Sequence, residues 1–164
     1  MTLFFEDVKF LLDDENAIMP CKGTKYSAGY DFFACKETSI PSEGRIVIDT
    51  GVISEIPEHT YGQLVSKSSL ACVGIDVCGG VIDADFRGRI KVILHNHSKT
   101  QSFKIEKGQK IAQMIVLPLA SKHAVKVEKV NKTTRGTGGF GSTGKWKKGE
   151  KDKNDKKPEP TGKN

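Results

Sequence analysis

Two segments of this chain carry residue types that could bind and activate a phosphorylated ligand. The first is the decapeptide RGTGGFGSTG, which begins at Arg135 and contains five glycines. Because so many glycines leave the backbone unfixed, we expect this stretch to stay flexible until a ligand orders it. Arg135 offers a planar fork for phosphate oxygens, Ser142 and Thr143 add hydroxyls, and Phe140 offers a face for a base. A plain flexible linker is the alternative interpretation.

The second segment is GGVIDADF, residues 79–86, in which carboxylates follow two glycines and an apolar Val-Ile pair. The glycines permit a tight hairpin whose backbone amides and carbonyls could approach a flat base closely. Asp83 is positioned to activate a water molecule as a general base. Asp85 is its rival, and in a regular strand the two carboxylates would share one face.

The sequence pattern predicts that the elements that position these segments are strands. Short apolar runs with β-branched residues recur between Gly, Pro and Asn, which is the spacing of an all-β protein. These runs cover residues 44–53, 61–66, 89–96, 110–119 and 124–130. Helical periodicity is scarce, and residues 66–77 could supply one short helical turn or none. We therefore predict a compact antiparallel β-barrel or sandwich of the jelly-roll type.

Length and composition limit the organisation of the chain. With 164 residues, 37% of them hydrophobic, it can bury one sizeable core, so we expect one domain with appendages. No apolar run approaches the roughly 18 residues of a membrane span, and the first ten residues mix acid and base rather than following a signal layout. We expect a soluble intracellular protein, in the cytoplasm or the nucleus, with no membrane partner.

The cysteines and histidines give little support for a metal site. Four cysteines include no CxxC pair, and no histidine lies at zinc-finger spacing from them, so we expect reduced thiols in the core. His95 and His97 would share a strand face, and a metal between them is the less favoured interpretation because a third ligand is missing.

Charge is concentrated at the end of the chain. Residues 145–164 hold 8 lysines and 4 acids, whereas positions 1–144 hold 18 basic and 16 acidic residues. The tail lacks aliphatic residues, so its composition predicts disorder. A solubilising tail is the simplest interpretation, and a weak nuclear-import or nucleic-acid attraction is the alternative; we expect no specific nucleic-acid binding.

Five segments in order resemble the trimeric deoxyuridine triphosphatases (dUTPases). They are SAGYDFFA, SKSSLA, GGVIDADFRGRI, KGQKIAQMI and RGTGGFGSTG, which together span Ser27 to Gly144. The resemblance implies a jelly-roll-like homotrimer with a flexible C-terminal arm. It divides the chain into a β-barrel domain at 1–131, a mobile glycine-rich arm at 132–144 that closes a neighbouring subunit's site, and a lysine-rich tail at 145–164.

The resemblance also implies a role for most of the site residues. Asp83 matches the aspartate that deprotonates the water attacking the α-phosphorus, with Asp85 left as a structural partner. Phe86 matches a tyrosine whose ring packs on the deoxyribose and excludes a 2′-hydroxyl. Asp31 matches an acid that touches the metal's water shell or organises the site from a neighbouring subunit. The other substrate-binding positions that it implies are Lys67, Ser68, Ser69, Gly80, Val81, Lys91, Gln113, Arg135, Phe140, Gly141, Ser142 and Thr143.

Four residues depart from the family's pattern. Lys67 replaces the usual arginine, so it keeps the charge and loses the bidentate fork. Phe86 keeps the ring of the usual tyrosine without its hydroxyl. Gln109 and Lys110 replace an aspartate and an arginine that are expected to make contacts within and between subunits.

The function that the resemblance implies is hydrolysis of dUTP to dUMP and pyrophosphate, with Mg²⁺ held through the substrate's phosphates. This reaction keeps uracil out of DNA and supplies dUMP for thymidylate synthesis. Two alternatives stay open. One is a relative of the dCTP deaminases, which share the barrel and a serine-rich segment. The other is a non-catalytic, regulatory dUTP-binding trimer, suggested by the four departures.

Overall fold

The computed structural model describes residues 6–120 and 123–139. The chain divides into two compact units between Lys122 and His123. Within the described residues, all regular secondary structure lies in the first unit and consists of eleven strands and one short helix. The prediction of an all-β protein is therefore confirmed.

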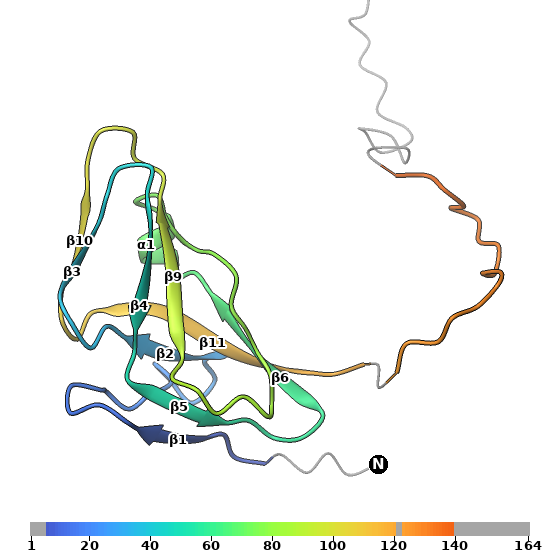
Figure 1. The fold of residues 1–164 in the computed structure, drawn as a ribbon, viewed down its shortest axis with the longest axis horizontal. Helices are drawn as coiled ribbons and strands as arrows, with labels where there is room; N and C mark the ends of the chain where they lie inside the picture. Colours follow the sequence, from blue (N-terminus) through green and yellow to red (C-terminus); the bar gives the residue numbers. More distant parts are fainter. Residues whose placement is uncertain (1–5, 121–122, 140–164) are drawn as a thin grey trace, which may run out of the picture. The chain divides into compact units, whose positions relative to one another are not determined.

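Antiparallel pairing joins the strands into two sheets and two ribbons (Figure 1). The larger sheet has the order β2 (Gly29–Phe33), β11 (Lys110–Pro118), β6 (Thr60–Val65), β8 (Val81–Ile82). The smaller sheet has the order β4 (Arg45–Asp49), β9 (Lys91–Asn96), β7 (Ile75–Val77). The ribbons pair β1 (Lys9–Leu12) with β5 (Val52–Glu55), and β3 (Thr38–Ile40) with β10 (Phe103–Ile105).

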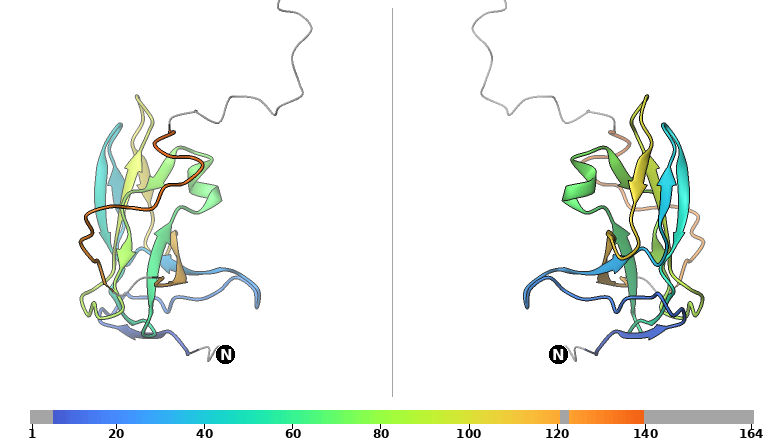
Figure 2. Two further views of the ribbon diagram at one scale, coloured as in Figure 1. Left: turned by 90° about the vertical axis from the view of Figure 1, so that its right-hand side faces the viewer. Right: turned by 90° about the vertical axis from the view of Figure 1, so that its left-hand side faces the viewer.

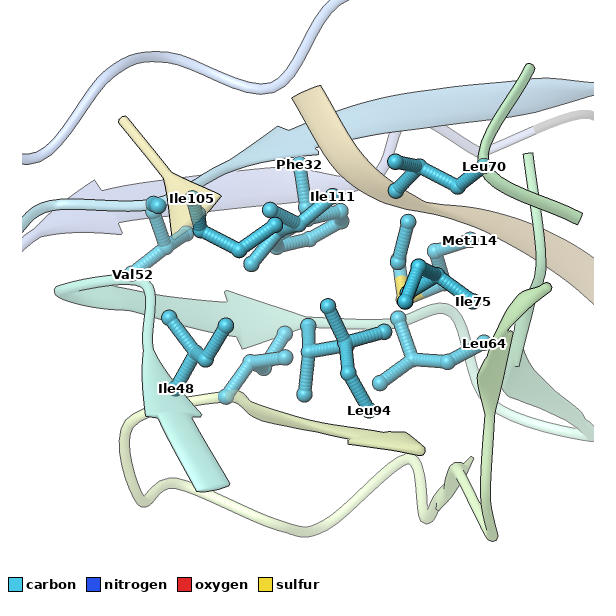
Figure 3. Close-up of a cluster of buried hydrophobic side chains, with 14 of the residues drawn as sticks. Phe32, Ile48, Val52, Leu64, Leu70, Ile75, Leu94, Ile105, Ile111 and Met114 are labelled. Carbon is cyan, nitrogen blue, oxygen red and sulfur yellow. The ribbon is translucent and has the colours of Figure 1, made fainter. Parts of the chain in front are cut away.

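The core of the first unit lies between these layers. Along β9 the side chains alternate, so that Val92, Leu94 and Asn96 are buried while Lys91 and Ile93 are exposed. Figure 3 shows side chains of the larger sheet facing those of the smaller sheet and the ribbons. The labelled residues are Phe32, Ile48, Val52, Leu64, Leu70, Ile75, Leu94, Ile105, Ile111 and Met114. Burial of this continuous apolar cluster is the main force that holds the strands in register.

The one helix is short and follows a strand of the larger sheet. Helix α1 spans Ser68–Ala71 and lies directly beyond the end of β6 (Figure 2). Leu70 is its buried residue and anchors the turn to the core. Of the two alternatives for residues 66–77, one short helical turn or none, the structure has the helical turn.

One predicted strand is absent from the single chain. Residues 124–130 contain no strand, and Val125, Val127 and Val130 are exposed. The alternation of valine with polar residues is typical of a strand, but a strand needs a hydrogen-bonding neighbour, and none of the described residues supplies one. The predicted arm and tail boundaries at 131 and 144 stay predictions, and residues 145–164 lie outside the described part.

The cysteines are free, and only Cys35 is buried. Cys21 and Cys72 are exposed and Cys78 is half-buried, so the expectation of four core thiols is wrong for the other three. Burial raises the pKa of the Cys35 thiol, which keeps it protonated and unreactive.

Among the described residues, no helix is long and apolar enough to cross a membrane.

Candidate active site

A β-bulge in β11 builds the centre of the candidate site. Gln113 of β11 is in register with Asp31 of β2, but the register shifts between Lys110 and Ala112, so that Lys110 lies opposite Phe33. The extra residue lets Ile111 and Ala112 both be buried. It also brings Lys110 onto the side of the sheet that carries Gln113 and Asp31, although regular alternation would place Lys110 on the other side.

Asp31 is a buried carboxylate held between two lysines. Its Oδ1 lies 2.5 Å from Lys67 Nζ, and its Oδ2 lies 2.8 Å from Lys110 Nζ. The side chain of Asp31 is only 9% exposed, compared with 20% for Lys67 and 46% for Lys110. Both oxygens of the carboxylate are thus occupied by ammonium groups.

The electrostatics of this cluster favour its charged form. Burial alone would raise the pKa of the Asp31 carboxyl, but hydrogen bonds and charge from Lys110 and Lys67 outweigh it and hold that pKa below its usual value. The hydrogen bond to Asp31, together with its negative charge, raises the pKa of Lys110. Asp31 and Lys110 are therefore both ionised at neutral pH.

Ser66 fixes the backbone beside this cluster. Gln113 Nε2 donates a hydrogen bond to the Ser66 carbonyl at 3.2 Å, and the Val77 amide donates to Ser66 Oγ at 2.9 Å. Helix α1 begins two residues later, and the hydroxyl-bearing residues Ser68 and Ser69 are exposed there. The structure thus brings together residues predicted from three segments: Asp31, Lys67 with Ser68 and Ser69, and Gln113.

Gly79 and Gly80 connect the two sheets and do not form the hairpin that the sequence predicts. Strand β7 before them pairs with β9, whereas β8 after them pairs with β6. Both glycines have positive φ, 76° and 111°. Leu64 of β6 donates its amide to the Gly80 carbonyl at 2.8 Å, and a Cβ at Gly80 would lie 2.7 Å from Leu64 Cβ. Only glycine allows this close approach.

Asp83 and Asp85 lie in a turn, so the expectation that they share a strand face is wrong. Strand β8 ends at Ile82, and the Phe86 amide donates to the Asp83 carbonyl at 3.1 Å, which closes the turn. Both carboxylates are exposed. The two-residue strand is too short to continue the alternation, since a turn directs successive side chains differently from a strand.

Val81 and Phe86 lie on either side of Asp83 and are exposed. Val81 is in register with Gln63 of β6, and 62% of its surface is accessible. Phe86 is 42% exposed, and its ring covers the backbone of Gly88, where a Cβ would lie 2.6 Å from Phe86 Cζ. Both side chains are therefore accessible, and their roles in substrate binding stay predictions.

The register of β8 on β6 separates Asp83 from the lysine cluster, which comprises Lys67, Asp31 and Lys110. Because Ile82 pairs with Gly62 in an antiparallel ladder, Asp83 continues toward Tyr61, at the opposite end of β6 from Lys67. Six residues of extended chain from Tyr61 to Lys67 span roughly 20 Å. A single chain therefore places its Asp83 far from its own Lys67 and Ser68.

The remaining predicted residues lie elsewhere. Lys91 is exposed at the start of β9, in register with Asp49, in the smaller sheet. Arg135 belongs to the second unit, where it is exposed and donates from Nε to the Gly138 carbonyl at 2.9 Å. The predicted contacts of Phe140, Gly141, Ser142 and Thr143 lie outside the described residues.

The donor set gives no protein cage for a metal. Among residues 6–120 and 123–139, no three His, Cys, Asp or Glu side chains come together in a way that could hold an ion. His97 Nε2 lies 3.0 Å from Asp76 Oδ2, and its ring is edge-on to His95 at 4.3 Å between centroids. Lys67 and Lys110 each contact one oxygen of Asp31, and because a carboxylate offers about four lone-pair sites, a contact of Asp31 to a metal's water shell stays a prediction. A magnesium ion carried by substrate phosphates would still be compatible with the site.

Two of the residues that depart from the family's pattern make local contacts. Gln109 Oε1 accepts a hydrogen bond from the Glu106 amide at 2.9 Å, so an amide oxygen closes this turn where an aspartate is usual. Lys110 binds Asp31. The sequence led us to expect contacts of Lys110 within or between subunits, but it did not indicate this partner. Lys110 is the site residue that sequence reasoning missed, because its side of the sheet depends on the bulge.

Fold and site together define a class: an antiparallel β protein with two lysines around a buried aspartate and a separate turn that presents a carboxylate. Comparison with known proteins identifies the family within this class. The dUTPase family model matches residues 15–144. The chain belongs to the dUTPase family.

Relatives come from fungi, plants and viruses. The deoxyuridine 5'-triphosphate nucleotidohydrolase of Debaryomyces hansenii is 41% identical over 112 residues, covering 68% of this chain and 69% of that protein. The enzyme of the same name from Oryza sativa subsp. japonica is 44% identical over 115 residues, covering 70% and 67%. That of Paramecium bursaria Chlorella virus 1 is 42% identical over 103 residues, covering 62% and 72%.

Solved structures share the fold. Staphylococcus bacteriophage 80α dUTPase in complex with dUpNHpp superposes with a TM-score of 0.79 at 27% identity, covering 85% of this chain and 99% of that one. The dUTPase of phage phi11 of S. aureus superposes with a TM-score of 0.72 at 25% identity, covering 78% and 100%. The likeness of the fold therefore extends well beyond the individual motifs.

Proposed function

We propose that this protein hydrolyses dUTP to dUMP and pyrophosphate. The observation that carries the proposal is the meeting of Lys67, Ser68 and Gln113, from two phosphate-binding segments far apart in sequence, at one end of β6. The names of the relatives and the dUTP analogue bound to the phage 80α enzyme support the same substrate. The reaction would keep uracil out of DNA and supply dUMP, inside the cell, in the cytoplasm or the nucleus.

The proposed roles follow from where each group lies. The lysine cluster and the Ser68 hydroxyl hold the phosphates, because ammonium and hydroxyl groups are strong donors to phosphate oxygens. Asp83 accepts a proton from the water that attacks the α-phosphorus. The Gly80 backbone reads the edge of uracil, and Phe86 packs on the deoxyribose. The arm that contains Arg135 closes over the ligand and excludes water.

The separation of Asp83 from Lys67 supports a homotrimer with shared sites. Since one chain keeps these groups roughly 20 Å apart along β6, a complete site needs Asp83 from one copy and the lysine cluster from another. The exposed valines of residues 123–130 are consistent with an arm whose strand partner lies on a neighbouring copy. This arrangement would also place Arg135 beside a neighbour's substrate.

Magnesium enters the proposal through the substrate. A dUTPase of phage phi11, 25% identical to this chain, is described with a structural Mg(II) ion. When bound to the triphosphate, Mg²⁺ would spread the charge of its oxygens and aid the departure of pyrophosphate. The residues of this chain then need only bind the substrate, orient it and deprotonate the attacking water.

The test is pyrophosphate release from dUTP, dTTP, dCTP and UTP with magnesium, for the intact chain and for Asp83→Asn. Asp85→Asn is the matched control, because it removes a carboxylate from the same turn. We expect release from dUTP alone, loss of at least about a hundredfold for Asp83→Asn and little change for Asp85→Asn. Full activity of Asp83→Asn would remove Asp83 from its role.

Two further measurements on the same protein, ammonia release from dCTP and binding of dUTP, distinguish the alternatives. Ammonia release from dCTP would identify a deaminase relative. Tight binding of dUTP by a folded trimer without turnover of any of the four nucleotides would identify a regulatory binding protein. A chain truncated before Arg135 should remain folded and lose most of its turnover; normal turnover would exclude the arm from the mechanism.

A further inference from the structure

The cluster of Lys67, Asp31 and Lys110 holds more positive than negative charge. Two ammonium groups share one carboxylate, so the cluster carries one net positive charge. Each ammonium has three hydrogen-bond donors, and the side-chain contacts to Asp31 use one donor on each lysine. The two lysines therefore keep donors available beside the exposed hydroxyls of Ser68 and Ser69.

The sharing of Asp31 has a consequence for Lys67. Lys67 is mostly buried and lies 2.5 Å from the carboxylate, which in the absence of another cation would neutralise it. Lys110 binds the second oxygen of the same carboxylate. Without Lys110 the pair would be neutral and would attract an anion only weakly, because the two opposite charges nearly cancel at the distance of a phosphate.

We propose that Lys110 is a positioning and charge-balancing residue for the phosphate subsite: by sharing Asp31 with Lys67, it leaves the cluster one positive charge for the triphosphate chain of the substrate. The bulge in β11 is the structural device that makes this possible, since it brings Lys110 to the side of Asp31. The location of the phosphate rests on the proposed function, whereas the charge balance of the cluster does not.

The experiment measures binding of inorganic triphosphate by titration calorimetry, in EDTA, at two salt concentrations. Inorganic triphosphate is the probe because it carries no base and so tests the cluster independently of nucleotide specificity. Lys110→Met removes the balancing charge and Lys110→Arg retains it. Lys104→Met is the matched control, because Lys104 also forms a single ion pair, 3.0 Å from Glu37, on the distant strand β10.

Lys110→Met is expected to weaken binding about tenfold, while Lys110→Arg and Lys104→Met stay within about twofold of the unchanged chain. The double variant Asp31→Asn with Lys110→Met should bind about threefold more tightly than Lys110→Met alone, since Lys67 is then no longer neutralised. This recovery is a readout that a merely structural role for Lys110 would not give. Lys110→Gln replaces Lys110→Met if the methionine variant does not fold.

Binding by Lys110→Met that equals binding by Lys104→Met would overturn the inference. So would a double variant that binds no better than Lys110→Met, or an unchanged chain that does not bind the probe. The dUTP assay on the same preparations shows whether only the inference about Lys110 fails or whether the proposed function fails as well. Rapid hydrolysis of dUTP with an unaltered KM in Lys110→Met would leave the function standing and refute the role of Lys110.

Discussion

Gly79 and Gly80 form a matched pair for measuring what the connection between the two sheets contributes to stability. Both have positive φ, so alanine is strained at either position. They differ in the space around them. A Cβ at Gly79 would meet only Ile93 Cδ1, at 4.0 Å, whereas at Gly80 it would lie 2.7 Å from Leu64 Cβ and 3.1 Å from the Leu64 carbonyl oxygen.

These distances determine how much each alanine substitution should lower the free energy of unfolding. Gly79→Ala adds backbone strain alone and should lower the free energy of unfolding by about 1 to 2 kcal/mol. Gly80→Ala adds overlap with the backbone of β6 and threatens the hydrogen bond from the Leu64 amide, so its total loss should reach about 3 to 4 kcal/mol. The difference, about 2 kcal/mol, combines the close approach to Leu64 with the greater strain of alanine at the φ of Gly80, 111°, compared with 76° at Gly79.

The assay is urea unfolding followed by circular dichroism, at one fixed protein concentration because association adds to apparent stability. Unchanged m-values would show that the two variants unfold from equally compact states. Equal losses for the two alanine variants would refute the reasoning, since only one of them meets Leu64. Gly80→Ala should also lower dUTP turnover while still folded, because β8 leads directly to Asp83.

Three further predictions follow from other contacts. Gly88→Ala would place a Cβ 2.6 Å from Phe86 Cζ, so the ring should shift and the kcat/KM preference for dUTP over UTP should fall by roughly tenfold; an unchanged preference would remove Phe86 from sugar recognition. Asp31→Asn should lower the urea midpoint at neutral pH. Because the pKa of Asp31 is held below its usual value, its contribution is present above the usual pKa and lost as pH falls through the lower folded pKa, so the difference between the two proteins should disappear in acid. Arg89→Ala should lower the urea midpoint more than Arg87→Ala, because Arg89 contacts Asp13, Asp14 and Asp49 whereas Arg87 bonds only nearby carbonyls.

Much of the fold could be predicted because its strands carry their own pattern. Residues 89–96 are a short apolar run with β-branched residues and contain β9, and residues 110–119 contain β11. Asp83 was found from residue type, since a general base needs a side chain that accepts a proton, whereas the serines after Lys67 were found from the resemblance to the family. The resemblance to the family implied roles for these residues that residue type alone could not indicate.

The relations between segments were the part that the sequence did not reveal. A two-residue periodicity places Lys110 and Gln113 on opposite sides of β11, and only the bulge reverses this. Two neighbouring glycines read as a hairpin, yet their flanking strands pair with different sheets. Residues 124–130 alternate valine with polar side chains as a strand does, but this pattern does not indicate which chain provides the neighbouring strand.

The distance between Asp83 and Lys67 along β6 also determines how defects combine in a mixed population of chains. When each site takes its carboxylate from one copy and its lysine cluster from another, a chain that lacks Asp83 and a chain that lacks a working lysine cluster can still form one intact site in a mixed trimer. Such mixtures should regain activity that neither inactive chain has alone. For the same reason, a single damaged chain in a trimer disables one site and leaves the others at work, so loss of function is graded rather than dominant.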